Sequence, residues 1–153
     1  MTPPDQSRSG SAETTEDLGR SFAAELAAGD IVLLDGNLAA GKTVFVRGIL
    51  AGLGGEPAAA SSPTFVLLQT YDCGVRDISS LHHVDLYRLG DRITDLREMG
   101  MEDILSDSTA VVAIEWPKDT LATWIPGDAR VWRVSISTLE DDSRLIEITP
   151  PSI

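Results

Sequence analysis

The chain has 153 residues, 42 % of them hydrophobic, which is enough for one folded domain with a buried core. Its 12 Lys and Arg residues are outnumbered by 24 Asp and Glu residues, and the net charge of −12 argues against tight, direct binding of nucleic acid. A single cysteine, Cys73, excludes an internal disulfide. No apolar run is long enough to span a membrane, and the polar start lacks the apolar middle of a signal peptide, so we expect a cytoplasmic location and no membrane binding.

The first elements follow from hydrophobic spacing. Residues 1–12 are rich in Pro, Ser and charge, and we expect a disordered leader before a single domain over residues 13–150. Apolar residues at helical spacing predict an amphipathic helix over residues 14–28, which Gly29 follows. Residues 30–35 are almost all apolar, as is typical of a parallel strand buried on both faces.

A phosphate-binding motif follows this strand. Residues 36–43 match G-x-x-x-x-G-K-[ST], and residues 43–53 have the apolar spacing of a helix. In such a loop the backbone N–H groups point at the phosphates, Lys42 reaches the β- and γ-oxygens, and Thr43 offers its hydroxyl to Mg²⁺. The alternative is an ordinary glycine-containing turn between strand and helix. The residues expected to bind ATP or ADP here are Asn37, Leu38, Ala39, Ala40, Gly41, Lys42, Thr43 and Val44.

The rest of the chain predicts a mixture of strands and short helices. We expect antiparallel strands over 64–71 and 80–87, one interrupted or two short helices over 93–105, a buried strand over 110–115, and a hairpin over 130–137 and 144–149. The fold class expected is α/β, a P-loop NTPase-like mixed sheet with parallel core strands, flanking helices and antiparallel hairpins.

A carboxylate ends the apolar strand over residues 110–115. Ligands of open α/β sheets bind at the carboxyl ends of the strands, so Glu115 should lie beside the phosphate-binding loop and hold Mg²⁺ together with Thr43. The alternative is a strand that ends in an acidic residue for solubility. Trp116 either packs on the nucleotide or belongs to the core.

Two further segments have a functional and a structural interpretation. Strand alternation places His83, Asp85 and Tyr87 on one face. There Asp85 could orient the attacking water or support the water shell of the metal, and His83 could fix Asp85 by a hydrogen bond. The alternative is a polar sheet face. Thr64, after Pro63, either senses the γ-phosphate or the metal, or simply enters a strand after a turn.

Taken together, four motifs resemble the TsaE family, also called the YjeE family, of bacterial P-loop ATPases in the tRNA threonylcarbamoyladenosine (t6A) pathway. They are residues 36–43, Ser-Pro-Thr-Phe at 62–65, His-Val-Asp-Leu-Tyr-Arg at 83–88 and Glu-Trp-Pro at 115–117. The resemblance covers about residues 14–147. It implies ATP hydrolysis that acts on a complex of TsaD and TsaB, with the t6A chemistry on TsaD.

The resemblance also implies roles for individual residues. It gives catalytic roles to Lys42, Asp85 and Glu115, Mg²⁺ binding to Thr43 and Glu115, and nucleotide contacts to Thr64 and Trp116. The family usually has Asp and Gly where this chain has Asn37 and Ala39. A left-handed backbone at Ala39 would cost about 1–2 kcal/mol relative to Gly.

Two other functions remain open at this point. One is a nucleotide-sensing binding module, in which ATP or ADP occupancy changes the affinity for a partner and hydrolysis is a slow reset. The other is a small-molecule kinase with Arg88, Arg92 and Arg97 as a basic lid, although the sequence has no long lid insertion.

Overall fold

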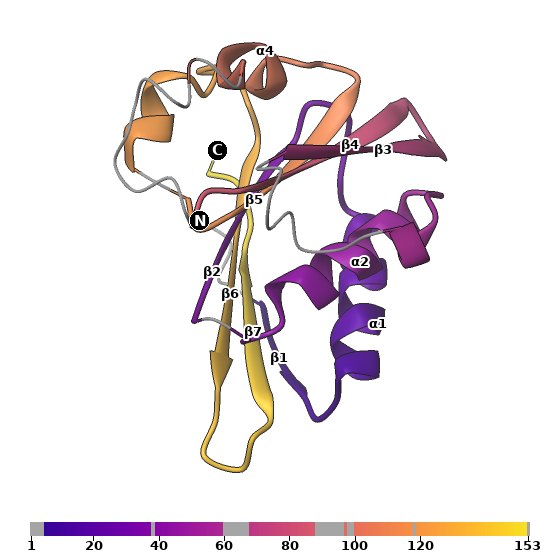
Figure 1. Ribbon diagram of the computed structural model, residues 1–153, viewed down its shortest axis with the longest axis vertical. Helices are drawn as coiled ribbons and strands as arrows, with labels where there is room; N and C mark the ends of the chain where they lie inside the picture. The colour runs from indigo at the N-terminus through magenta and orange to yellow at the C-terminus, as the bar shows by residue number, and fades with distance from the viewer. Residues whose placement is uncertain are drawn as a thin grey trace.

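A computed structural model of the protein describes residues 5–37, 39–59, 68–87, 97, 100–117 and 119–152. Within these residues a seven-stranded sheet has the order β1-β7-β6-β2-β5-β4-β3 (Figure 1). Strands β6, β2, β5 and β4 are parallel, whereas the pairs β1–β7, β6–β7 and β3–β4 are antiparallel. The mixed sheet with a parallel core confirms the expected fold class. The strands are β1 (Asp5–Ser9), β2 (Ile31–Gly36), β3 (Leu68–Val75), β4 (Ile78–Asp85), β5 (Ala110–Glu115), β6 (Val131–Thr138) and β7 (Arg144–Thr149).

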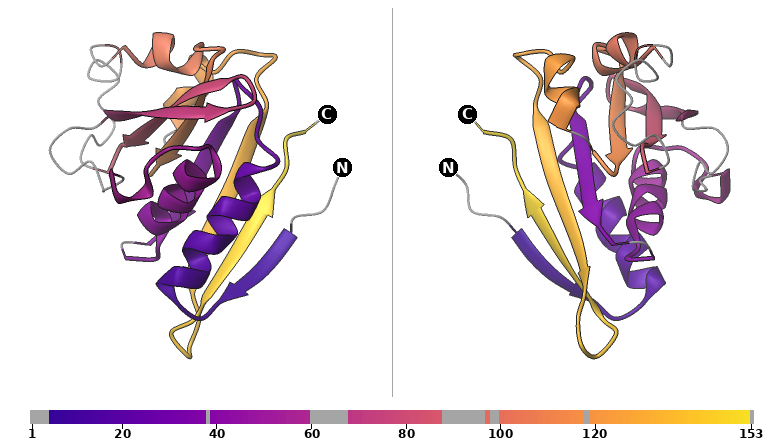
Figure 2. Two further views of the ribbon diagram at one scale, coloured as in Figure 1. Left: turned by 90° about the vertical axis from the view of Figure 1, so that its right-hand side faces the viewer. Right: turned by 60° about the vertical axis from the view of Figure 1, so that its left-hand side comes forward.

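Two helices, α1 (Ala12–Ala23) and α2 (Lys42–Gly52), pack side by side on one face of the sheet (Figures 1 and 2). Glycines at their contact allow a close approach. A Cβ atom on Gly19 would lie 2.3 Å from a backbone oxygen of α2, and one on Gly48 would lie 2.0 Å from a backbone oxygen of α1. This contact fixes the start of α2, and with it the phosphate-binding loop, against α1.

Short elements cover the opposite face of the parallel core. The helix α4 (Met101–Leu105) and the 3-10 turn η2 (Asp119–Thr123) pack there, and a further 3-10 turn, η1 (Pro57–Ala59), follows α2. Gly100 precedes α4 with a left-handed φ of 78°, which agrees with the interruption expected within residues 93–105. The buried side chains of this second core cluster are Ile31, Leu33, Val84, Leu86, Met101, Ile104, Leu105, Val112, Ile114 and Leu121.

The register of the parallel strands brings their carboxyl ends together. All six residues of β5 are buried, as expected for a strand covered on both faces. Glu115 at its end pairs with Leu34 of β2 and with Asp85 of β4. The sheet therefore delivers Glu115 and Asp85 to the edge where the loop between β2 and α2 begins.

The expectation of a disordered leader is wrong for residues 5–9. They form β1, which pairs with β7 from Asp5 opposite Ile148 to Ser9 opposite Arg144. Helix α1 also starts earlier than expected, because the hydroxyl of Ser11 caps it by accepting from the N–H of Thr14 at 3.0 Å. Backbone pairing at a sheet edge does not need apolar side chains, so the polar composition of β1 concealed it.

Other boundaries differ from the expected ones. Helix α1 ends at Ala23 rather than at residue 28, and β3 continues to Val75 rather than ending at residue 71. The first part of the strand expected over residues 64–71 lies outside the described residues, as does most of the helical region before Gly100. In the described part of the chain, no helix is long and apolar enough to cross a membrane.

Candidate nucleotide-binding site

The loop between β2 and α2 has the backbone that its sequence predicts. A Cβ atom on Gly36 would lie 2.6 Å from the backbone oxygen of Ile136, so only glycine fits at the end of β2. Gly41 caps α2 with a φ of 110°. Ala39 has a left-handed φ of 64°, the conformation that glycine adopts at no steric cost. Ala39 therefore has the left-handed backbone whose cost relative to glycine was considered from the sequence.

Lys42, the first residue of α2, is only 5 % exposed. Its Nζ donates to the backbone oxygen of Gly36 at 2.5 Å and lies 3.5 Å from the ring centroid of Trp116. Burial lowers the pKa of Lys42, while nearby carboxylates, first that of Glu115, act in the opposite direction. The ammonium group thus lies inside the loop, held by a carbonyl and an aromatic face.

Glu115 accepts two hydrogen bonds at one carboxylate oxygen. The Thr43 hydroxyl donates to Oε2 at 3.0 Å, and His83 Nε2 lies 2.5 Å from the same atom. Glu115 is 3 % exposed and His83 is fully buried. Because a carboxylate only accepts, Nε2 of His83 carries the proton. The structure thus brings together Thr43 and Glu115, the two residues expected to bind Mg²⁺.

The interpretation in which His83 fixes Asp85 is wrong. Nε2 of His83 bonds to Glu115, and its buried Nδ1 has no hydrogen-bond partner among the described residues. Asp85 instead accepts from the backbone N–H of Tyr87 at 2.9 Å. Alternation along β4 does place His83 and Asp85 on one face, but the closest carboxylate to His83 comes from the neighbouring strand.

Trp116 lies beside the loop and outside both buried core clusters. Its ring centroid is 4.9 Å from that of Tyr87, and its backbone has a left-handed φ of 58°. A bulky residue adopts this conformation only when its surroundings impose it, and such strain concentrates at functional sites. Trp116 is therefore a residue of the loop region and not an ordinary core tryptophan.

The other residues expected at the site have simpler positions. Asn37 accepts the N–H of Ala40 through its backbone oxygen at 3.1 Å, and Val44 lies half-buried in the first turn of α2. Leu38 and Thr64 lie outside the described residues. Among the arginines considered for a lid, Arg97 is exposed, and the other two are not described.

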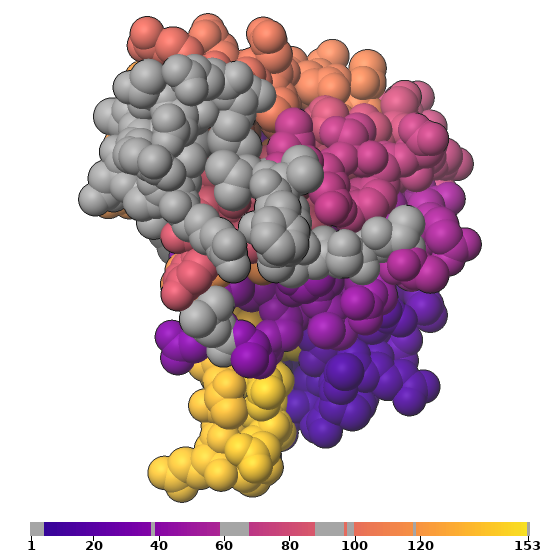
Figure 3. Space-filling model, in the orientation of Figure 1, coloured from indigo at the N-terminus to yellow at the C-terminus, as the bar shows by residue number. Residues whose placement is uncertain are grey.

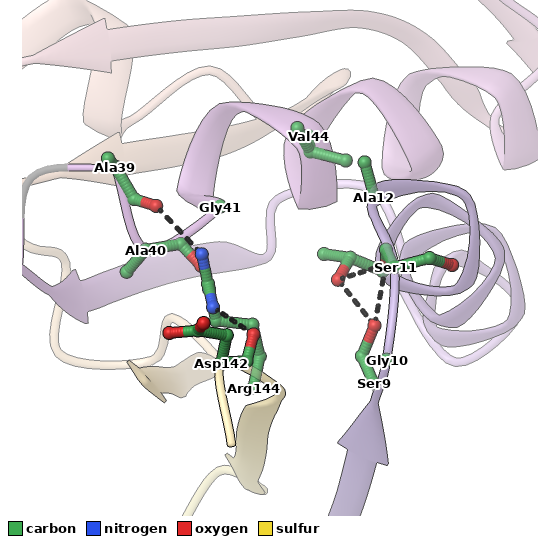
Figure 4. Close-up of a pocket in the computed structure, with 11 residues that line it drawn as sticks. Ser9, Gly10, Ser11, Ala12, Ala39, Ala40, Gly41, Val44, Asp142 and Arg144 are labelled. Atoms are coloured by element: carbon green, nitrogen blue, oxygen red, sulfur yellow. Dashed lines mark hydrogen bonds between the residues drawn. The ribbon is translucent and has the colours of Figure 1, made fainter. Parts of the chain in front are cut away.

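A pocket opens beside the phosphate-binding loop, and Ala39, Ala40 and Gly41 form part of its wall (Figure 4). It lies between the junction of β1 and α1, the phosphate-binding loop and the turn between β6 and β7. That turn projects from the body of the molecule (Figure 3). No pattern in the sequence predicted this pocket, because its walls come from segments far apart in the chain. Its lining residues are Ser9, Gly10, Ser11, Ala12, Thr15, Ala39, Ala40, Gly41, Val44, Asp142 and Arg144.

The donor set at Thr43 and Glu115 fits Mg²⁺. Both side chains offer hard oxygen atoms, and Mg²⁺ commonly takes one or two protein ligands together with waters and substrate phosphates. In the described part of the chain, no group of three His, Cys, Asp or Glu side chains is placed to hold a metal ion. The pair therefore suits a magnesium ion that arrives with a nucleotide better than one held by protein alone.

Comparisons with known proteins agree with this geometry. The family model described as "Threonylcarbamoyl adenosine biosynthesis protein TsaE" matches residues 9–146. The protein of that name from Rickettsia bellii is 38 % identical over 139 residues, which cover 91 % of this chain and 90 % of that protein. The protein of the same name from Streptomyces coelicolor is 42 % identical over 100 residues, 65 % of each chain.

A solved structure shows the same fold. The crystal structure of Bacillus subtilis YdiB superposes with a TM-score of 0.72 at 27 % identity and covers 99 % of this chain and 88 % of that one. The family match extends over most of the chain, and the sheet, loop and carboxylate lie where the motifs predicted them. The chain belongs to the TsaE family of threonylcarbamoyl adenosine biosynthesis proteins.

Proposed function

We propose that this protein binds ATP and ADP with Mg²⁺ and hydrolyses ATP. The observation that supports the proposal most is the hydrogen bond between Thr43 and Glu115 beside the buried ammonium of Lys42. The helix dipole of α2 and the loop N–H groups add positive potential at the same place. A buried cation, two hard oxygen ligands and a helix N-terminus are the parts that phosphoryl transfer requires.

The residues have separable roles in this proposal. Lys42 exchanges the Gly36 carbonyl and the Trp116 ring for the β- and γ-phosphate oxygens, because an ionised phosphate is a stronger partner than either. Thr43 and Glu115 hold Mg²⁺, which supplies charge neutralisation on the phosphates when bound. His83 keeps the Glu115 carboxylate oriented through Nε2.

Asp85 is the proposed positioning group for the attacking water. It ends β4 directly beside Glu115 in the sheet register, on the loop side of the sheet. The water oxygen forms a bond to the γ-phosphorus, the bond from that phosphorus to the β,γ-bridging oxygen breaks, and ADP leaves with the electron pair. The water proton passes to Asp85 or to the released phosphate.

The nucleoside is proposed to occupy the pocket between the phosphate-binding loop, the junction of β1 and α1, and the turn between β6 and β7. Ala39, Ala40, Gly41 and Val44 line it, so a phosphate chain in the loop would continue into it. The hydroxyls of Ser9 and Thr15 bond to each other at 2.7 Å at its wall. We place the ribose and base in this pocket because it adjoins the loop and has polar groups in its wall.

Within the t6A pathway we propose an accessory role on a complex of TsaD and TsaB. The net charge of −12 repels the phosphates of tRNA, so little binding free energy can come from counterion release. The isolated chain should therefore show no tight tRNA complex at physiological salt. Nucleotide binding must replace the contacts of Lys42 with the Gly36 carbonyl and the Trp116 ring, and we propose that turnover by the protein alone is slow. A nucleotide-sensing module with slow hydrolysis therefore stays the second candidate.

One experiment separates these functions. Phosphate release from ATP is measured with and without purified TsaD and TsaB, together with t6A formation and partner binding in ATP and in ADP. Faster release with the partners supports an ATPase role. Nucleotide-dependent partner binding without faster release supports the sensing module, and the absence of ADP binding contradicts both. A submicromolar, strongly salt-dependent tRNA complex of the chain alone would contradict the accessory role.

A further inference from the structure

The side chain of Arg144 reaches from the start of β7 to the phosphate-binding loop (Figure 4). Its Nε donates to the backbone oxygen of Ala40 at 3.0 Å, and its Nη2 donates to that of Ala39 at 3.4 Å. Its Nη1 donates to the backbone oxygen of Asp142 at 2.6 Å. One guanidinium group thus connects the loop to the turn between β6 and β7.

Two of these three carbonyls belong to residues with left-handed backbones. The φ angle is 64° at Ala39 and 66° at Asp142. For a residue with a Cβ atom this conformation is disfavoured by a factor of roughly 5 to 30 relative to the right-handed one. Asp tolerates it through local hydrogen bonds of its side chain, but Ala has no such compensation. The turn hydrogen bond from the N–H of Ala40 to the oxygen of Asn37 restrains Ala39 locally, and a contact from elsewhere can offset the remaining cost.

The backbone of Arg144 is restrained by strand pairing on both sides. It pairs with Ser9 of β1 on one side and with Thr138 of β6 on the other. In the adjoining turn, Ser143 donates its backbone N–H to the Asp141 carboxylate at 3.1 Å, and its hydroxyl donates to the same oxygen. The guanidinium therefore reaches the loop from a strand hydrogen-bonded on both edges.

The hydrogen bonds also orient the loop donors. In a planar trans peptide the C=O and the following N–H point in opposite directions. When Arg144 holds the carbonyl of Ala40, the N–H of Gly41 points away from the guanidinium. The carbonyls of Ala39 and Ala40 are the atoms that must turn away from bound phosphate oxygens, since like partial charges repel.

We infer that Arg144 is a positioning residue that holds Ala39 and Ala40 in the nucleotide-binding conformation, a role that glycine at position 39 would make largely unnecessary. This inference rests on the proposed function of the loop as a phosphate site. The contacts of Arg144 explain how Ala39 keeps a left-handed backbone in the loop. Through Arg144, the turn between β6 and β7 also takes part in nucleotide binding.

The test is a double-mutant cycle on the full chain with wild type, Ala39→Gly, Arg144→Met and the double variant. ADP affinity is measured by calorimetry. Arg144→Met should weaken ADP binding about 10-fold with Ala39 present and less than about 3-fold with glycine there, because contacting residues couple. Arg144→Lys keeps the charge but not the planar fork and should behave like Arg144→Met.

The matched control is Arg20→Met on α1. It removes one cation whose side chain is 54 % exposed and pairs with Asp17, away from the loop. Its ADP affinity should equal that of wild type. If Arg144→Met does not fold, as judged by thermal unfolding, Arg144→Lys runs the same cycle.

A second measurement needs no nucleotide. The ¹³C carbonyl shifts of residues 39 and 40 in the free protein should move in Arg144→Met and stay in Arg20→Met. Equal loss of ADP affinity with alanine and with glycine at position 39 would overturn the inference and make Arg144 a direct ligand or a long-range charge. A wild type that binds no ADP would instead refute the proposed function, and unmoved carbonyl shifts would overturn the inference independently.

Discussion

The phosphate-binding loop lies between two regions that are built differently. On one side, the carboxyl ends of β2, β4 and β5 present buried ionisable side chains, including Glu115 and His83, that bond to one another. On the other side, Arg144 at the start of β7 reaches the loop, where its guanidinium group donates to the backbone oxygens of Ala39 and Ala40. We propose that the first region acts through individual charged and hydrogen-bonding side chains, whereas the second region restrains the backbone of the loop.

This difference predicts how substitutions will act. A change among the buried side chains removes a charge or a ligand that nothing nearby replaces, so turnover should fall steeply. A change in the polar turn shifts a loop that has other restraints, such as the hydrogen bond from Ala40 to Asn37, and its effects should be graded.

The largest effect is expected from Lys42→Ala. It removes the only ammonium that the described structure places inside the loop, and turnover should fall by about 1000-fold with loss of ADP binding. Calorimetry and phosphate release measure both. Arg20→Ala removes an exposed cation and controls for net charge. Wild-type turnover in a folded Lys42→Ala protein would refute the phosphate-site assignment.

Asp85→Asn should separate chemistry from binding. If Asp85 positions the attacking water as proposed, loss of its carboxylate should lower turnover about 100-fold, while ADP affinity stays within about twofold of wild type. The turnover number and the ADP dissociation constant are compared at one Mg²⁺ concentration. Equal losses in both quantities would show that Asp85 holds the end of β4 rather than water.

Thr43→Ala tests the metal side of the same region. The hydroxyl that bonds Glu115 is lost, but the backbone N–H groups that hold phosphates remain, so Mg²⁺-dependent turnover should fall about 10- to 100-fold. ADP affinity measured with EDTA should change little. Thr109→Ala removes an exposed hydroxyl that donates to the Asp107 carboxylate before the start of β5, and it is the matched deletion away from the site. If EDTA affinity falls as much as turnover, Thr43 contacts phosphate rather than metal.

The smallest effect is expected in the turn. Hydrogen bonds from Ser143 hold the pKa of the Asp141 carboxyl below its usual range. A lowered folded-state pKa stabilises the protein above the unfolded pKa of about 3.9, and this contribution is lost as pH falls through the folded pKa. The stability difference between wild type and Asp141→Asn should therefore be small at pH 7 and vanish in acid, as denaturant titrations would show.

A control checks the origin of that effect. Glu140→Gln removes a neighbouring negative charge in the same turn and leaves the hydrogen bonds of Ser143 in place. Ser143→Ala should raise the pKa of Asp141 toward its usual value in an NMR titration. An unchanged pKa in Ser143→Ala would mean that net charge, and not the turn, sets the titration.

The two regions also differ in what their sequence revealed. Contiguous motifs predicted both the loop at residues 36–43 and the strand that ends at Glu115. The parallel register of β2 and β5 then brings the two together. The bond from His83 to Glu115 was not predictable, since it joins neighbouring strands and depends on their spatial order. Strand β1 and the contact from Arg144 left no compositional trace, because backbone pairing and single guanidinium bonds are independent of hydrophobic spacing.

The central claim is that Thr43 and Glu115 form a magnesium site that makes this loop an ATPase. It is tested most directly by phosphate release from saturating ATP by wild type and Glu115→Gln, across a Mg²⁺ titration, with Glu56→Gln on the exposed loop after α2 as control. We predict Mg²⁺-dependent release by wild type and Glu56→Gln, and a loss of about 100-fold in Glu115→Gln. Normal Mg²⁺-dependent release by Glu115→Gln would contradict the account and leave Glu115 as a buried strand end.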